Sequence, residues 1–112
     1  MNLESLIEKY TEQTIIHLEE SWNGNSTISN KARRKRMKYF EQIKNIDKTL
    51  DEFLILLNHE NEYVQLGASF HLLKQHEKQA VNKLLMLKDS NIGGVAFNAK
   101  MVLDQWQKGH LK

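Results

Sequence analysis

The sequence predicts an all-α fold, and three observations support this prediction. The chain of 112 residues contains no proline and only five glycines, so few positions would interrupt a helix. Apolar residues recur three or four positions apart along most of the chain, which is the spacing of one helix face. Finally, one pattern of apolar and turn positions occurs twice in the C-terminal half.

Length and composition favour a single domain over residues 1–112, because common domains contain about 100–150 residues. The chain has no cysteine, which excludes disulfides and thiolate metal sites. The N-terminus is acidic and amphipathic, so we expect no signal peptide. No apolar run approaches the roughly 18 residues that span a bilayer. We therefore expect a cytoplasmic protein with no membrane partner.

Residues 1–46 are expected to form a pair of helices. The first runs from Leu3 to about Ser21 and has one apolar face. Its other side carries an acidic strip with a carboxylate at every fourth position: Glu4, Glu8 and Glu12. Turn-forming residues then fill Asn23–Asn30 and predict a loop. Ser29 or Asn30 would cap the second helix, which ends near Asn45.

The central segment is expected to contain two more helices. Asp47 would cap the first, whose apolar positions keep helical spacing: Leu50, Phe53, Leu54 and Leu57. The composition of its apolar run would also suit a buried strand, but the spacing and a nearby acid pair favour a helix. The second helix begins at Asn61, an N-cap residue, and is apolar on two sides. We expect it to pack between neighbours.

Two hairpins, 47–75 and 77–108, are predicted to share one design. A constant offset aligns their apolar positions and also matches the small residues Ala68 and Ala99. Further aligned pairs are Leu50 with Val81, Phe53 with Leu84, Val64 with Val95, Phe70 with Met101 and Leu72 with Leu103. Helical repeats of this length bury their apolar faces by stacking. The predicted fold is therefore a stack of five to six helices.

The segment Asn61–Ser69 resembles the turn and second helix of a HEAT-type repeat, with Gln65 where that family prefers Arg. From about Asn30 to Leu111, including the ending Gly94–Gly109, the chain resembles small bacterial HEAT-like domains of unknown function. This resemblance implies a right-handed α-α superhelix. Some proteins of this kind look like immunity proteins. The resemblance thus implies a non-enzymatic protein that neutralises a cognate toxin by direct binding.

The charge is unevenly distributed, although the net charge is only +2. Residues 31–38 contain six bases and no acid: Lys31, Arg33, Arg34, Lys35, Arg36 and Lys38. This run could be a solvated face that pairs with the acidic first helix, or a patch for an acidic protein partner. It could also grip nucleic-acid phosphates, although it lacks the interleaved aromatics of a single-strand binder. Composition alone leaves these three interpretations open.

A second candidate surface is the polar arc of the paired second helices. The repeat alignment sets Gln65 and Ser69 beside Lys100, Asp104 and Gln107. Such arcs form extended binding surfaces in stacked helical repeats, but the same pattern also fits an ordinary wet face. Both interpretations remain open.

The sequence contains no catalytic constellation. His71 and His76 are five positions apart and lie on different sides of a helix, and there is no His-Glu-x-x-His motif. There is no Gly-x-Ser-x-Gly motif, and Gly93–Gly94 fits a tight turn. We expect no enzyme, no metal and no cofactor. The alternatives to an immunity protein are a nucleic-acid-binding helical repeat that uses the basic second helix, and a generic adaptor.

Overall fold

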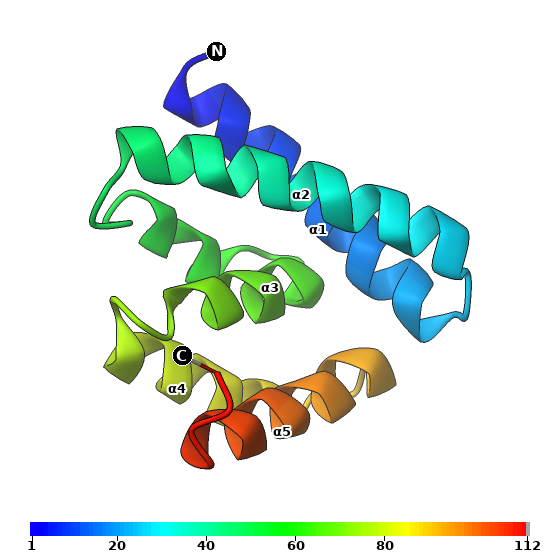
Figure 1. Cartoon of the computed structure of the whole chain (residues 1–112). Helices are drawn as coiled ribbons and strands as arrows, with labels where there is room; N and C mark the ends of the chain where they lie inside the picture. Colours follow the sequence, from blue (N-terminus) through cyan, green and yellow to red (C-terminus); the bar gives the residue numbers. More distant parts are fainter. Residues whose placement is uncertain (112) are drawn as a thin grey trace. The chain divides into compact units, whose positions relative to one another are not determined.

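Helices are the only regular secondary structure in the described part of the chain. The structure is a computed structural model that describes residues 1–111. Its elements are α1 (Leu3–Trp22), α2 (Ser26–Ile46), the 3-10 helix η1 (Phe53–Asn58), α3 (Glu62–Leu72), α4 (Glu77–Leu87) and α5 (Gly93–Gln107) (Figure 1). No strand occurs among these residues. The predicted all-α fold of five to six helices is confirmed, while the HEAT-like superhelix stays a prediction.

Internal contacts divide the chain into two compact units, and the boundary lies within η1, between Leu54 and Ile55. Helices α1 and α2 belong to the first unit, and helices α3 to α5 belong to the second. The first unit therefore contains the predicted N-terminal pair of helices and the segment that follows it. The prediction of one domain over residues 1–112 stays a prediction.

Helices α1 and α2 form an antiparallel hairpin with a very short connection (Figure 1). Only residues 23–25 separate them, so the predicted loop Asn23–Asn30 is wrong in its second half. Ser29, expected as a cap, lies inside α2 and is buried. Its hydroxyl donates to the carbonyl of His17 on α1 at 3.0 Å. This contact between the helices holds turn-forming residues in helical conformation, against their local preference.

The core of the first unit is built around three aromatic rings, Tyr10, Phe40 and Phe53. The ring centroids are 5.0 Å apart for Tyr10 and Phe53, 5.4 Å for Phe40 and Phe53, and 6.0 Å for Tyr10 and Phe40. All three side chains are buried. Aromatic pairs at such distances contribute attraction beyond their buried area. The hairpin is therefore completed by a residue that follows α2 in the chain.

The predicted helix beginning at Asp47 is wrong over residues 47–52, which form turns, and the helical part is the 3-10 helix η1. The carboxylate of Asp47 accepts a hydrogen bond from the backbone N–H of Phe53 at 3.0 Å. Leu50 has a φ of 60°, which a right-handed helix cannot contain, yet its side chain is only 1% exposed. Burial of Leu50 and Phe53 therefore outweighs the local helical pattern.

In the second unit, α3 packs against both α4 and α5. Asn61 caps α3 as predicted, because its Oδ1 accepts from the N–H of Tyr63 at 2.8 Å. Both apolar sides of α3 contribute buried residues, as expected for a helix between neighbours: Val64, Leu66, Ala68 and Leu72. Phe70, on the same helix, is 40% exposed. The indole N–H of Trp106 donates to Glu77 at 2.7 Å, which ties the end of α5 to the start of α4. The bounds of α4 and α5 agree with the predicted second helical pair.

The conformation of Leu50 leads to a testable prediction. Both Leu50→Ala and Leu50→Gly remove a buried side chain, so both should destabilise the protein by about 2–4 kcal/mol. At a positive φ, however, glycine is free of the Cβ clash, so Leu50→Gly should be more stable than Leu50→Ala by about 1 kcal/mol. Urea denaturation measures the two free energies of unfolding. A Gly variant less stable than the Ala variant would contradict the left-handed conformation.

Candidate partner-binding surface

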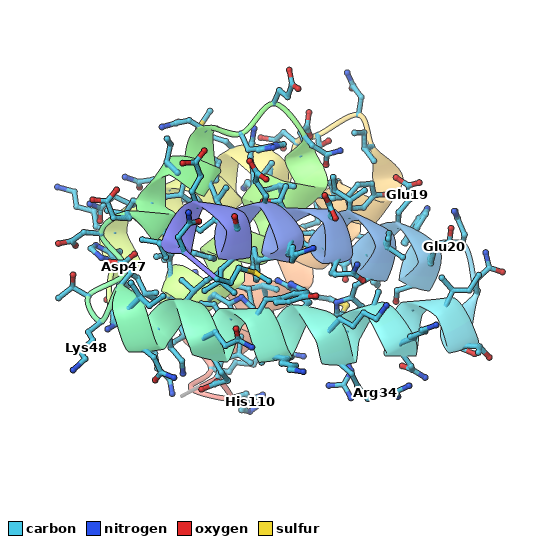
Figure 2. All side chains as sticks on the ribbon, turned by 90° about the horizontal axis from the view of Figure 1, so that it is seen from above. Glu19, Glu20, Arg34, Asp47, Lys48 and His110 are labelled. Carbon is cyan, nitrogen blue, oxygen red and sulfur yellow. The ribbon has the colours of Figure 1, made fainter. Side chains whose placement is uncertain are left out.

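Five of the six predicted basic residues are exposed on α2: Lys31, Arg33, Arg34, Lys35 and Lys38. Four of them, Lys31, Arg34, Lys35 and Lys38, recur three or four positions apart and share one side of the helix, which we call the basic face. Figure 2 shows Arg34 extending from the side of α2 that faces away from α1. The structure therefore presents most of the predicted basic run to solvent.

The five exposed bases have no acidic partner in the described part of the chain. Among residues 1–111, no carboxylate lies within 4.0 Å of their charged nitrogens. The ion pair shown on α2 joins Lys44 and Glu41 at 3.2 Å, outside the basic run. Pairing of these bases with the acidic strip of α1, one of the three interpretations left open by the sequence, is thus not found in the described part of the chain. Their charge is available to an external partner.

Arg36 behaves differently from the rest of the run, because it is only 4% exposed. Its Nη2 donates to the hydroxyl of Tyr10 at 3.1 Å, and its Nη1 lies 3.2 Å from Nδ1 of His17. The guanidinium carbon lies 5.3 Å from the centroid of the Tyr10 ring, in cation–π range. The structure thus places this predicted site residue inside the hairpin, where it joins α2 to α1.

The role of Arg36 was missed at the sequence level, although its position contained a usable signal. Arg36 lies four positions after Ala32 and four before Phe40, and both of these side chains are buried. Residues four apart share one helix face, so Arg36 falls on the buried face of α2. Counting the basic residues of this run without regard to their helical spacing therefore misses the burial of Arg36.

Burial and the charge of Arg36 shift the pKa values of both its partners on α1, Tyr10 and His17. Burial raises the pKa of Tyr10, while the charge of Arg36 and its hydrogen bond oppose that rise. Burial, together with the smaller effects of the Arg36 and Arg33 charges, lowers the pKa of His17 to about 4. His17 is therefore neutral at pH 7. Since a guanidinium only donates, Nδ1 of His17 accepts and its ring proton lies on Nε2.

The second candidate surface is only partly exposed. Ser69 is fully buried, and its hydroxyl donates to the carbonyl of Gln65 at 2.7 Å. The half-buried Gln65 donates from Nε2 to the carbonyl of His59 at 2.5 Å. On α5, Lys100 and Asp104 are exposed, and Asp104 pairs with Lys108 at 3.1 Å. Of the five residues predicted here, three are thus exposed: Lys100, Asp104 and Gln107.

Three further findings concern metal binding, membrane spanning and similarity to known proteins. Within residues 1–111, no group of three or more His, Cys, Asp or Glu side chains is arranged to hold a metal ion. None of the described helices combines the length and the apolar character needed to cross a bilayer. Comparison with protein-family models, curated proteins and solved structures yields no match. The exposed charges of α2 are therefore the best-defined candidate site.

The contrast between Arg36 and Arg34 predicts a difference in stability. Arg36→Ala leaves a cavity and removes the hydrogen bond to the Tyr10 hydroxyl, so it should lower the free energy of unfolding by about 2–4 kcal/mol. Arg34→Ala is the matched control from the exposed side, and it should change this free energy by less than about 0.5 kcal/mol. Chemical denaturation of both variants checks this difference. Equal losses would show that Arg36 does not join the two helices.

The lowered pKa of His17 predicts an acid-labile contribution to stability. The unfolded chain binds a proton at His17 below pH 6.5, whereas the folded chain does so only near pH 4. Stability present above pH 6.5 is therefore lost as the pH falls towards 4. Because His17 is half exposed, we expect this loss to be only about 1–2 kcal/mol.

The control for this prediction is His17→Asn, which keeps an acceptor near the position of Nδ1 but does not titrate. Denaturation curves at pH 7 and pH 4.5 give the acid-induced loss of stability for each protein. Wild-type protein should lose about 1–2 kcal/mol more than His17→Asn. Identical losses would mean that the folded state does not exclude the proton from His17.

Proposed function

We propose that this chain is a non-enzymatic protein-binding module that docks an acidic protein partner through the basic face of α2. In its most concrete form it is a bacterial, cytoplasmic immunity protein that neutralises a cognate toxin by direct binding. The single observation that carries the proposal is that five exposed bases lack an acidic partner among residues 1–111.

The geometry of α2 supports binding of a partner with fixed carboxylate spacing. Lys31 and Lys38 are separated by about 10 Å along the helix axis, at 1.5 Å per residue. Behind them, Arg36 joins α2 to α1 through Tyr10 and His17. A rigid support reduces the ordering cost that an interface must offset. Complementary charge then speeds association and selects acidic surfaces over basic ones.

The immunity-protein form of the proposal rests on the resemblance of Asn61–Ser69 and Gly94–Gly109 to small bacterial HEAT-like domains. The capped start of α3 and the pairing of α4 with α5 are compatible with that resemblance. Resemblance of fold does not determine function, so the toxin itself must be identified by experiment. A toxin domain encoded by the neighbouring gene would be the first candidate partner.

The test is a charge-reversal variant of three basic-face residues, Arg34→Glu/Lys35→Glu/Lys38→Glu, which leaves the buried Arg36 intact. Its matched control, Lys9→Glu/Lys74→Glu/Lys78→Glu, reverses three exposed bases elsewhere and has the same net charge. We expect the wild type and the control to bind the purified partner alike, and the variant to bind at least about tenfold more weakly. Titration calorimetry measures the three dissociation constants. Equal affinities for variant and control would remove the basic face from the binding site.

Two results would redirect the proposal to its alternatives. Binding of duplex DNA that weakens steeply with rising salt, together with loss of that binding in the variant, would identify a nucleic-acid-binding protein. A captured protein partner whose activity is unchanged by the complex would indicate a generic adaptor. Protection of cells that express the partner by wild-type protein, but not by the variant, supports the immunity function.

A further inference from the structure

The first unit carries opposite charges on opposite sides. The basic face lies on α2, and the acidic strip of Glu4, Glu8 and Glu12 lies on α1. All three carboxylates are exposed, and no cation within residues 1–111 pairs with them. In Figure 2, Glu19 on α1 and Arg34 on α2 extend in opposite directions from the hairpin. Each side therefore presents a charged surface that the other side does not neutralise.

The two charged surfaces match in length and spacing. Glu4 and Glu12 are separated by about 12 Å along α1, and Lys31 and Lys38 by about 10.5 Å along α2, at 1.5 Å per residue. Neighbouring charges recur every four positions on α1 and every three or four on α2. The acidic strip of one molecule can therefore lie along the basic face of another, with several opposite charges in register.

We infer that the basic face also binds the acidic strip of a second copy of this chain. The contact joins two different surfaces, so a bound pair keeps one free basic face on one copy and one free acidic strip on the other. Such head-to-tail contacts produce rings or open chains rather than closed two-fold dimers. The inference does not rest on the proposed function, although an acidic protein partner would compete for the same face.

A second copy is the occupant favoured by the structure, because its complementary strip is visible on the same molecule. Exposed ion pairs are individually weak and are screened by salt. The association is therefore expected at high protein concentration and low ionic strength, and it should be reversible. Dilution or added salt should return the protein to monomers of 13.2 kDa.

Sedimentation equilibrium tests this inference with four proteins. They are the wild type, the acidic-strip variant Glu4→Lys/Glu8→Lys/Glu12→Lys, the basic-face variant Lys31→Glu/Arg34→Glu/Lys38→Glu, and the combination of both. The combined variant reverses the acidic strip and three of the four basic-face charges, and it restores the wild-type net charge of +2. Circular dichroism confirms that each protein is folded before it is compared.

At about 0.01 M salt, the average mass of the wild type should rise with concentration beyond that of a dimer, and at about 0.3 M salt it should fall to the monomer. Each single-face variant should remain monomeric, and the combined variant should associate like the wild type. Restored association of the combined variant, at the wild-type net charge, would show that pairing of the two surfaces causes the association and net charge does not.

Three results would overturn the inference. The wild type could remain monomeric at low salt up to the highest soluble concentration. The acidic-strip variant could associate as strongly as the wild type, which would mean that the basic face binds something other than this strip. Nuclease treatment could abolish the association, which would assign it to bound nucleic acid. None of these results bears on the dissociation constant for a protein partner, so the proposed function is tested separately.

Discussion

The guanidinium of Arg36 joins the two longest helices of the chain through three contacts with α1. It donates to the hydroxyl of Tyr10, meets Nδ1 of His17 and lies over the Tyr10 ring. Burial of a cation is costly unless neighbouring groups replace its hydration, and these groups do so for Nη1 and Nη2. The contacts also set the rotation of α2 about its axis. With Arg36 directed towards α1, the basic face is directed towards solvent, because successive residues advance by about 100°.

The basic run of residues 31–38 therefore has two roles, one in the core and one on the surface. Arg36 belongs to the buried face together with Ala32, Phe40 and Ile43. Its neighbours along the chain carry the exposed charge. A neutral His17 beside Arg36 is part of this arrangement, because a second cation there would oppose the guanidinium. The segment after α2 completes the unit, since the turn at Asp47 and the buried Leu50 bring Phe53 against Tyr10.

The sequence predicts the helical class and most helix positions, because periodicity and capping are local signals. Helix α1, the Asn61 cap of α3 and the bounds of α4 and α5 follow from those signals. The start of α2 does not, because Ser29 is held in helix by a hydrogen bond to His17 across the hairpin. The turns of residues 47–52 are not predicted either, because Leu50 adopts a left-handed conformation that is stabilised by burial of its side chain.

For the candidate surface, too, the local sequence predicts some features, and contacts between helices decide others. The exposure of Lys31, Arg34, Lys35 and Lys38 follows from composition, whereas the burial of Arg36 requires the periodicity of α2 and its partners on α1. Ser69 was assigned to a polar arc, but its hydroxyl is satisfied by the backbone of the preceding turn and is fully buried. A polar side chain that hydrogen-bonds to its own helix does not require contact with water, so its polarity alone does not predict whether it is exposed.

The most direct test of the central interaction is the protonation state of His17 and the exchange rate of the Arg36 guanidinium, both measured by ¹⁵N NMR at pH 6. This arrangement predicts a neutral ring with its proton on Nε2 and an unprotonated Nδ1 that accepts a hydrogen bond from Arg36. It also predicts slower exchange for the guanidinium protons of Arg36 than for those of Arg33 and Arg34. A charged His17, or equally fast exchange at all three arginines, would contradict it.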